Sequence, residues 1–116
     1  MLMQDKTDTE VLEIVNQIMD NLMDASTRID HEQHTRDFTE RLRAIVTQEY
    51  LSKVCRQYQN EKGFFADREL ISLIRRPDAI AVLWKQQFTK AKGDFVAEAL
   101  FVDRGGEYKV DHVMIW

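Results

Sequence analysis

Apolar residues in the N-terminal half of the chain recur every three or four positions, as they do along one face of an amphipathic helix. The clearest stripe runs from Thr9 to about Ala25, and either Thr7 or Asp8 is available as its N-cap. Polar residues lie off the stripe, so we expect a helix that packs along one side and leaves the other in water. The stripe consists of Val11, Ile14, Val15, Ile18, Met19 and Leu22.

Further helices are predicted before the middle of the chain. Residues 26–37 are polar and without a period, which is typical of a connection or a frayed short helix. Thr39 can cap a short helix, and Thr47 can cap a longer one that stops at Gly63. The inward-facing residues are expected to be Leu42, Ile45 and Val46 in the first of these, and Tyr50, Leu51, Val54, Cys55 and Tyr58 in the second.

After Phe64 and Phe65 the apolar period changes from helical to two, the period of a half-buried strand. Turn-forming residues divide this half of the chain into four runs. Helices followed by strands are the order of an α+β fold, and 116 residues suit a single domain covering 1–116. The predicted strands are about 68–76, 79–90, 94–103 and 107–116, which we expect to form an antiparallel sheet.

The pair Gly105-Gly106 favours a two-residue hairpin turn, because both central positions of a type I′ turn need a positive φ. That turn sets Phe101 opposite Val110, Ala99 opposite His112 and Phe95 opposite Trp116. The competing turn at Arg104-Gly105 sets Glu98 opposite Asp111, and like charges across a pair are destabilising. We therefore prefer the first register.

The preceding turn is treated as a four-residue loop from Lys90 to Gly93, which pairs Phe88 with Phe95 and Trp84 with Ala99. Together the two turns bring Trp84, Ala99 and His112 into one row. That row belongs to a nearly apolar face, which we expect to meet the helices. The opposite face mixes charges with apolar residues and is expected to form an interface through Val96, Leu100, Val102, Val113 and Ile115.

The run Gly106-Glu107-Tyr108-Lys109-Val110, the ending Val113-Met114-Ile115-Trp116, the strand before them and the preceding helices resemble the cystatin-like and nuclear transport factor 2-like superfamily. The resemblance is to small bacterial members without an assigned function. It implies N-terminal helices packed on a curved, four-stranded antiparallel sheet, a cone-shaped cavity and frequent dimerisation through the sheet. The superfamily includes isomerases, dehydratases, transport factors and association domains, so the resemblance implies a fold and no one function.

A candidate ligand-binding site lies on the predicted helix-facing side and consists of Trp84, Gln86, Tyr108 and His112. His112 could act as an acid or base near neutral pH, and would be the catalytic residue if the protein is an enzyme. A histidine among aromatic residues is more often a packed core residue that bonds a backbone group. The enzyme-like members of the superfamily usually work with a carboxylate inside the cone, and no Asp or Glu falls on this face.

Metal and cofactor sites are not expected. His31 and His34 lie three apart beside acidic residues, a spacing that could hold a divalent cation on a helix, but polar connections between helices often look like this. The zincin motif would need two residues between Glu32 and the second histidine. The sequence contains no glycine-rich phosphate loop, no Ser/His/Asp set and no CxxC pair, so no cofactor is predicted.

Charge and cysteine content limit the partners. The net charge is −4 and the pI about 5.3, so nucleic acid and anionic membranes are not expected to bind. The lone Cys55 is in helical phase with Leu51 and Tyr58, which indicates a small buried residue in a reducing compartment. The N-terminus lacks the features of a secretory signal, and the longest apolar run, Ala79 to Trp84, is far below the roughly 20 residues of a membrane span. A cytoplasmic location is predicted.

These observations favour a noncatalytic binding or association module that forms a homodimer through its sheet and binds a protein or small-molecule ligand. The alternative is a small lyase, isomerase or hydrolase that uses a cavity between helix and sheet, around Trp84, Gln86, Tyr108 and His112. The two differ in whether that cavity is open and whether His112 meets solvent inside it.

Overall fold

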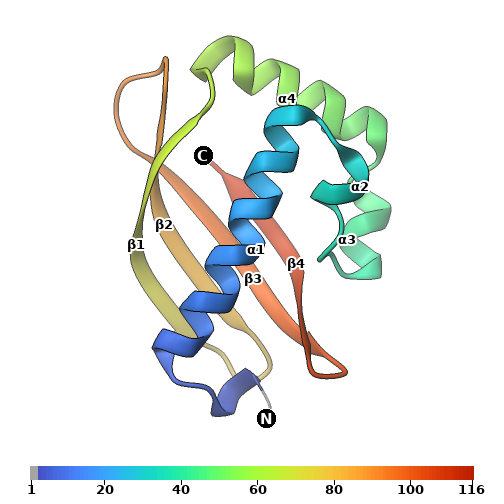
Figure 1. The fold of residues 1–116 in the computed structure, drawn as a ribbon, viewed down its shortest axis with the longest axis vertical. Helices are drawn as coiled ribbons and strands as arrows, with labels where there is room; N and C mark the ends of the chain where they lie inside the picture. The colour runs from blue at the N-terminus through green and yellow to red at the C-terminus, as the bar shows by residue number, and fades with distance from the viewer. Residues whose placement is uncertain (1–2) are drawn as a thin grey trace.

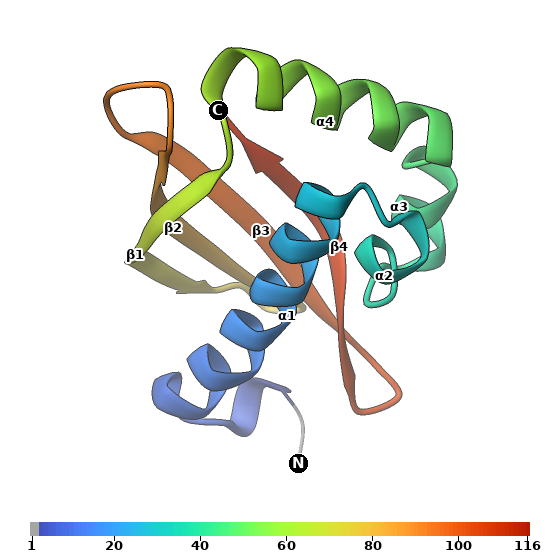
Figure 2. The same cartoon turned by 45° about the horizontal axis from the view of Figure 1, so that its top comes forward.

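A computed structural model describes residues 3–116 of the protein and shows the predicted order of helices followed by strands (Figure 1). The four strands form one antiparallel sheet in the order β1-β2-β3-β4. Every helix lies on the same side of the sheet, so the α+β prediction is confirmed (Figures 1 and 2). The elements are a 3-10 turn Met3–Asp5, α1 Asp8–Arg28, α2 His31–His34, α3 Glu40–Ile45, α4 Gln48–Lys62, β1 Phe65–Arg75, β2 Ile80–Phe88, β3 Phe95–Arg104 and β4 Glu107–Ile115.

Helix α1 begins at a capping box and crosses the sheet (Figure 1). The Thr7 hydroxyl accepts a hydrogen bond from the Glu10 N–H, and the Glu10 carboxylate accepts one from the Thr7 N–H. The helix ends at Arg28, three residues beyond the predicted end, and the C-cap Ile29 has the left-handed conformation. Its predicted stripe is buried against the sheet, apart from Ile14, which is half-buried.

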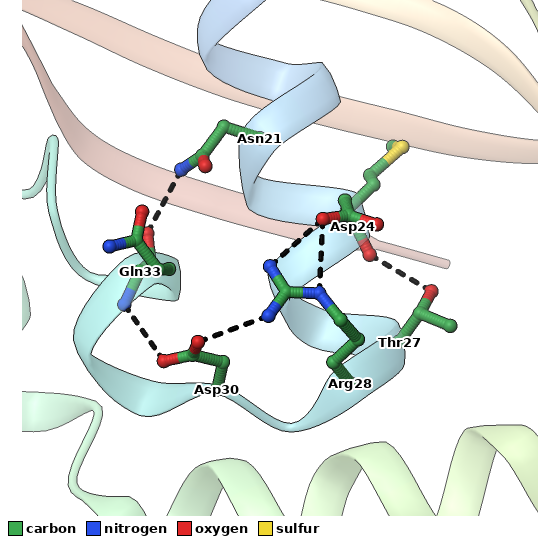
Figure 3. A network of polar contacts seen from close by, with 7 residues as sticks. Asn21, Asp24, Thr27, Arg28, Asp30 and Gln33 are labelled. Atoms are coloured by element: carbon green, nitrogen blue, oxygen red, sulfur yellow. Dashed lines mark hydrogen bonds and ion pairs between the residues drawn. The ribbon is translucent and has the colours of Figure 1, made fainter.

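The link between α1 and α2 is held by a polar network rather than frayed (Figure 3). Arg28 donates to the carboxylates of Asp24 and Asp30. Asp30 also caps α2 by accepting from the N–H of Gln33, whose carbonyl accepts from the Asn21 side chain. This exposed network positions α2 beside the C-terminal half of α1.

Helices α3 and α4 begin where predicted, because the Thr39 and Thr47 hydroxyls accept hydrogen bonds from the N–H groups of Leu42 and Tyr50. In α4, Leu51 and Cys55 are buried and Tyr58 is partly buried. The expected inward position of Tyr50, Val54 and the α3 residue Ile45 is wrong, since all three are exposed. Only a narrow stripe of α4 contacts the rest of the molecule, because the helix spans one end of the sheet instead of crossing its face (Figure 2).

The hairpin between β3 and β4 turns at Gly105-Gly106 and sets Phe101 opposite Val110, as predicted. The hairpin between β2 and β3 differs, because Trp84 lies opposite Ala97 and Gln86 opposite Phe95. The loop is longer than four residues because its first residues form hydrogen bonds with the end of α4 and the residues after it. The Thr89 N–H donates to the Phe64 carbonyl, and the N–H groups of Lys90 and Ala91 donate to the Lys62 carbonyl. A slip of two residues leaves the faces of β2 and β3 unchanged.

A β-bulge at Asp111 reverses the sides of the sheet to which the side chains in the second half of β4 point. Val110 lies opposite Phe101 and His112 opposite Leu100, so Asp111 has no partner of its own in β3. The predicted pair of Ala99 with His112 is therefore wrong, and Ala99 lies opposite Val113. Beyond the bulge the odd-numbered residues turn toward the helices, and the even-numbered His112, Met114 and Trp116 turn to the opposite side, here named the open face.

The bulge has a tertiary cause. The extended segment 37–39 adds to the outer edge of β4 at Val110, whose N–H donates to the Asp37 carbonyl and whose carbonyl accepts from the Thr39 N–H. The Asp111 carboxylate accepts from the Thr39 hydroxyl at 2.8 Å and from Arg41 Nε at 3.1 Å. These contacts draw Asp111 toward the edge of the sheet and out of the ladder with β3.

We predict that Asp111→Ala lowers the free energy of unfolding by about 1–3 kcal/mol, because the buried Thr39 hydroxyl loses its acceptor. Although burial opposes it, the hydrogen bonds from Thr39 and Arg41 lower the pKa of Asp111. The contribution should therefore be complete above the ordinary carboxyl pKa and decline as the pH falls through the lower pKa of the folded state. Urea unfolding at pH 7 measures it.

The matched control is Glu107→Ala in the same strand, which removes only an exposed ion pair with Lys109. Its effect should stay below about 0.5 kcal/mol. Equal effects of the two substitutions would contradict the anchoring of Asp111.

Candidate functional site

Two residues of the predicted site, Trp84 and Gln86, are packed in the core and line none of the pockets described below. Trp84 is 2% exposed and Gln86 fully buried. The guanidinium of Arg68 lies 5.4 Å from the Trp84 ring centroid, and Gln86 Nε2 donates to the carbonyls of Ala66 and Gln87. The side chain of Gln86 therefore stabilises the irregular start of β1, where the register with β2 shifts between Phe65 and Arg68.

Tyr108 lies near the start of β4 and is buried beside α1, with no hydrogen-bond partner for its hydroxyl. Burial raises the pKa of Tyr108, so the phenol is neutral at physiological pH. It borders a shallow hollow with Ile14, Ile18 and Gly106, away from the other predicted site residues.

His112 belongs to the open face and so lies on the opposite side of the sheet from Trp84. Its Nε2 is 3.0 Å from Glu98 Oε2, and the other Glu98 oxygen accepts from Trp116 Nε1 at 2.6 Å. The hydrogen bonds from Trp116 and then His112 lower the pKa of Glu98. The predicted grouping of Trp84 with His112 is wrong, so no pocket forms around Trp84, Gln86, Tyr108 and His112 together.

The structure instead forms a pocket of about 490 Å³ between α4 and the second half of β4, which we call the α4–β4 groove. A volume in this range is typical of binding sites. Val113 and Ile115, predicted on the interface face, lie on the helix side and border this groove because of the bulge. The other apolar residues lining it include Leu42, Ile45, Val46, Leu51, Val54, Tyr58, Phe65 and Phe88.

Ser26, Cys55 and Tyr58 form a small polar cluster in the wall of the groove. Ser26 Oγ lies 2.9 Å from the Tyr58 hydroxyl and 3.2 Å from Cys55 Sγ. Desolvation raises the pKa of both Cys55 and Tyr58, so the thiol and the phenol are neutral near pH 7. Cys55 is buried, as predicted, and an uncharged buried thiol is a poor nucleophile.

His34 also borders the groove and is a buried imidazole whose Nδ1 has no hydrogen-bond partner. Burial, and then the charge of His31, lowers the pKa of His34 to about 4. His31 is separately engaged, since its Nε2 lies 2.7 Å from the Val46 carbonyl oxygen. Among residues 3–116, no group of three or more His, Cys, Asp or Glu side chains could hold a metal ion.

The charged side chains that border the groove are Arg41 and Lys62, and no carboxylate of the described residues does so. Arg41 lies at the Asp111 end, and Lys62 lies 5.6 Å from the Phe95 ring at the other end. The groove thus combines an apolar interior with cations at its two ends. This chemistry suits binding of an apolar group. The imidazoles of His34 and His112 also border the groove, and the Glu98 carboxylate 3.0 Å from His112 lies outside its lining.

One sequence feature could have revealed this geometry. In Val110-Asp111-His112-Val113 two polar residues stand between apolar ones, so the apolar phase changes from even to odd positions within β4. A break in alternation of this kind is the pattern of a bulge. Separately, no helix of residues 3–116 is long and apolar enough to cross a membrane.

No protein-family model matches the chain, and no curated protein matches it. Solved structures with a similar fold include Rd1NTF2_05, with a TM-score of 0.62, 9% identity and coverage of 88% of this chain and 96% of that one. An NTF2-like protein of unknown function from Pseudomonas putida has a TM-score of 0.54, 13% identity and coverage of 95% and 88%. A SEC-C motif containing protein from Rhodopseudomonas palustris has a TM-score of 0.58, 12% identity and coverage of 89% of each chain.

A protein from Bdellovibrio bacteriovorus is also similar, with a TM-score of 0.55 and 12% identity, and this chain spans 42% of its length. The fold of this protein is therefore the nuclear transport factor 2-like fold that the resemblance in sequence implied. Identities this low show the fold alone. Function has to be argued from the surfaces of the molecule.

We predict that His34 makes stability depend on pH. The unfolded state protonates this imidazole below about pH 6.5 and the folded state only near pH 4, so the free energy of unfolding falls as the pH drops between those values. Urea unfolding should show that wild type loses about 2 kcal/mol more than His34→Gln between pH 7 and pH 5. Parallel pH profiles for the two proteins would contradict a buried neutral imidazole.

Proposed function

We propose that this protein is a noncatalytic association module that forms a homodimer through the open face of its sheet. Helices cover the other face, and none of the described elements lies over this one (Figure 2). A curved sheet with one bare face is stable in water only when that face is polar or is covered by a partner.

The observation that carries the proposal is the exposure of large apolar side chains on the open face. Met114 is 52% and Trp116 is 61% exposed, and Ile74 at the other edge is exposed as well. Of the predicted interface residues, Val96, Leu100 and Val102 have their side chains on this face. The contact surface that we propose therefore consists of Ile74, Leu83, Val96, Leu100, Met114 and Trp116, while Val102 on the same face is already buried.

Charges on the open face favour a second copy of this chain as the partner. Lys85 lies 3.2 Å from Glu69, and the Glu98 carboxylate lies 3.0 Å from His112 Nε2 and 2.6 Å from Trp116 Nε1, so these charged groups already have partners within the face. Two such faces can approach without bringing unpaired like charges together, although the chain as a whole carries a charge of −4. An isologous contact, in which the same patch serves on both subunits, meets this condition.

Glu98 has a further role in this surface, because it holds two side chains at once. Its oxygens contact Trp116 Nε1 and His112 Nε2, which restrains the exposed indole beside β3. An aromatic side chain that is already immobilised loses little conformational entropy on association. This arrangement supports Trp116 as a central contact of the dimer.

We predict that the wild-type protein sediments as a dimer at micromolar concentration, and that Met114→Lys raises the dimer dissociation constant at least tenfold. The substitution places a charge where the apolar contact would bury it. Sedimentation velocity over a concentration series measures both.

The matched control is Ile45→Lys, since Ile45 is 53% exposed on α3 and Met114 is 52% exposed on the open face. It should leave the dissociation constant unchanged. A wild-type protein that stays monomeric at high micromolar concentration would refute the proposal, and equal weakening by the two substitutions would move the interface away from the open face.

A further inference from the structure

The outer edge of β4 carries backbone hydrogen-bonding groups that have no partner. Val96 and Trp116 exchange both of their N–H to carbonyl bonds, and residues along an antiparallel strand alternate in this respect. Met114 therefore directs its backbone groups to β3, while Val113 and Ile115 direct theirs away from it. Among residues 3–116, the N–H and carbonyl groups of Val113 and Ile115 have no hydrogen-bond partner outside the ladder with β3.

The same edge of β4 already pairs with an extended segment of this chain, before the bulge at Asp111. At Val110, residues 37–39 add to β4 in parallel, with N···O distances of 2.7 and 2.9 Å. Phe38, in the middle of this segment, is buried and packs its ring against His34. Coverage stops there because Thr39 begins α3 and the chain turns away. The edge beyond Asp111 is left uncovered.

This uncovered edge borders the α4–β4 groove. Val113 and Ile115 line it on one side, while Leu51, Val54 and Tyr58 of α4 line it on the other. An edge strand with free backbone groups beside an apolar groove is the arrangement that binds extended peptides by strand addition, in which the main chain provides affinity and alternate side chains enter the groove.

The exposed apolar side chains of the helical wall have no other explanation within the described fold. Ile45 of α3, together with Tyr50 and Val54 of α4, is exposed although each borders the groove. An extended guest along β4 would cover all three. The cations at the two ends, Arg41 and Lys62, already pair with Asp111 and Glu61. Both side chains are partly exposed, so they can also contact acidic residues that a guest carries beside its apolar ones.

We propose that the α4–β4 groove binds an extended peptide segment with alternating apolar residues and flanking acidic ones, which adds as a fifth strand to residues 113–115 of β4. The groove shares His112 and Met114 with the open face, while its helical wall and the free backbone groups of Val113 and Ile115 lie outside the proposed dimer contact. The partner is a segment of another protein in extended conformation.

The experiment uses the full chain and a labelled peptide of the sequence acetyl-Glu-Val-Thr-Val-Thr-Val-Glu-amide. Two analogues carry N-methyl groups, one on the valine amides and the other on the threonine amides. In a bound peptide only one set of backbone N–H groups can point toward β4. It is the set of the valines in an antiparallel guest and the set of the threonines in a parallel one. We expect fluorescence anisotropy to show saturable binding of the parent and at least a tenfold loss for one analogue alone.

Equal affinity of the two analogues would overturn strand addition. Binding of the dye anilinonaphthalene sulfonate in the groove, with no peptide binding up to about 1 mM, would also overturn the proposal and assign the groove to a small apolar ligand.

Amide hydrogen exchange gives a direct readout of the backbone contacts. Bound peptide should slow exchange at Val113 and Ile115 and leave Met114 unchanged, because the Met114 amide is already directed toward β3. Unchanged exchange at Val113 and Ile115 in the presence of saturating peptide would overturn the proposal.

Two substitutions separate this site from the dimer interface. Ile45→Lys should weaken peptide binding at least fivefold and leave sedimentation unchanged. Ile74→Lys, on the open face at the far edge of the sheet and outside the groove, should do the reverse. Val113→Pro removes one N–H from the outer edge, where no bond within the sheet depends on it, and should weaken peptide binding with the circular dichroism spectrum retained. Peptide affinity that is insensitive to both Ile45→Lys and Val113→Pro would place the peptide elsewhere and overturn the inference.

Discussion

The open face and the α4–β4 groove both depend on a small set of hydrogen bonds between the segment before α3 and the middle of β4. Residues 37–39 occupy the backbone groups of Val110, and Thr39 and Arg41 bind the Asp111 carboxylate. These bonds join parts of the chain about seventy residues apart. They take one residue out of the ladder between β3 and β4, and in doing so decide which side chains of the last strand face the helices.

One extra residue has this large effect because the side chains of a strand alternate with a period of two. Without the bulge, Met114 and Trp116 would lie under the helices, and Val113 and Ile115 would face outward. With it, a methionine and a tryptophan become exposed on the open face, where Glu98 orients the indole. The shorter Val113 and Ile115 border the α4–β4 groove instead, and smaller side chains there leave room for a guest.

Several polar groups of the interior connect elements of the fold. Gln86 satisfies carbonyls at the irregular start of β1, and Ser26 links Cys55 to Tyr58 between α1 and α4. His34 is buried, and its low pKa keeps it neutral.

Most of the fold could be predicted from local patterns. The helical stripe of α1, the threonine caps of α3 and α4, the change of period after Phe65 and the Gly105-Gly106 turn each depend on residues within a few positions of one another. Such features reflect backbone preferences and side-chain periodicity, which act within a single element. They were sufficient for the α+β class, the order of elements and the faces of β2 and β3.

The candidate site could not be predicted in the same way, because it is set by contacts between distant elements. Regular alternation through Asp111 predicts that His112 lies beside Trp84, on the helix-facing side of the sheet. Only the tertiary structure shows that Thr39 and Arg41 hold Asp111 at the sheet edge and that α4 spans the end of the sheet. The sequence by itself determined which residues form helices and strands, and the contacts between those elements decided which side of the sheet each residue of the last strand faces.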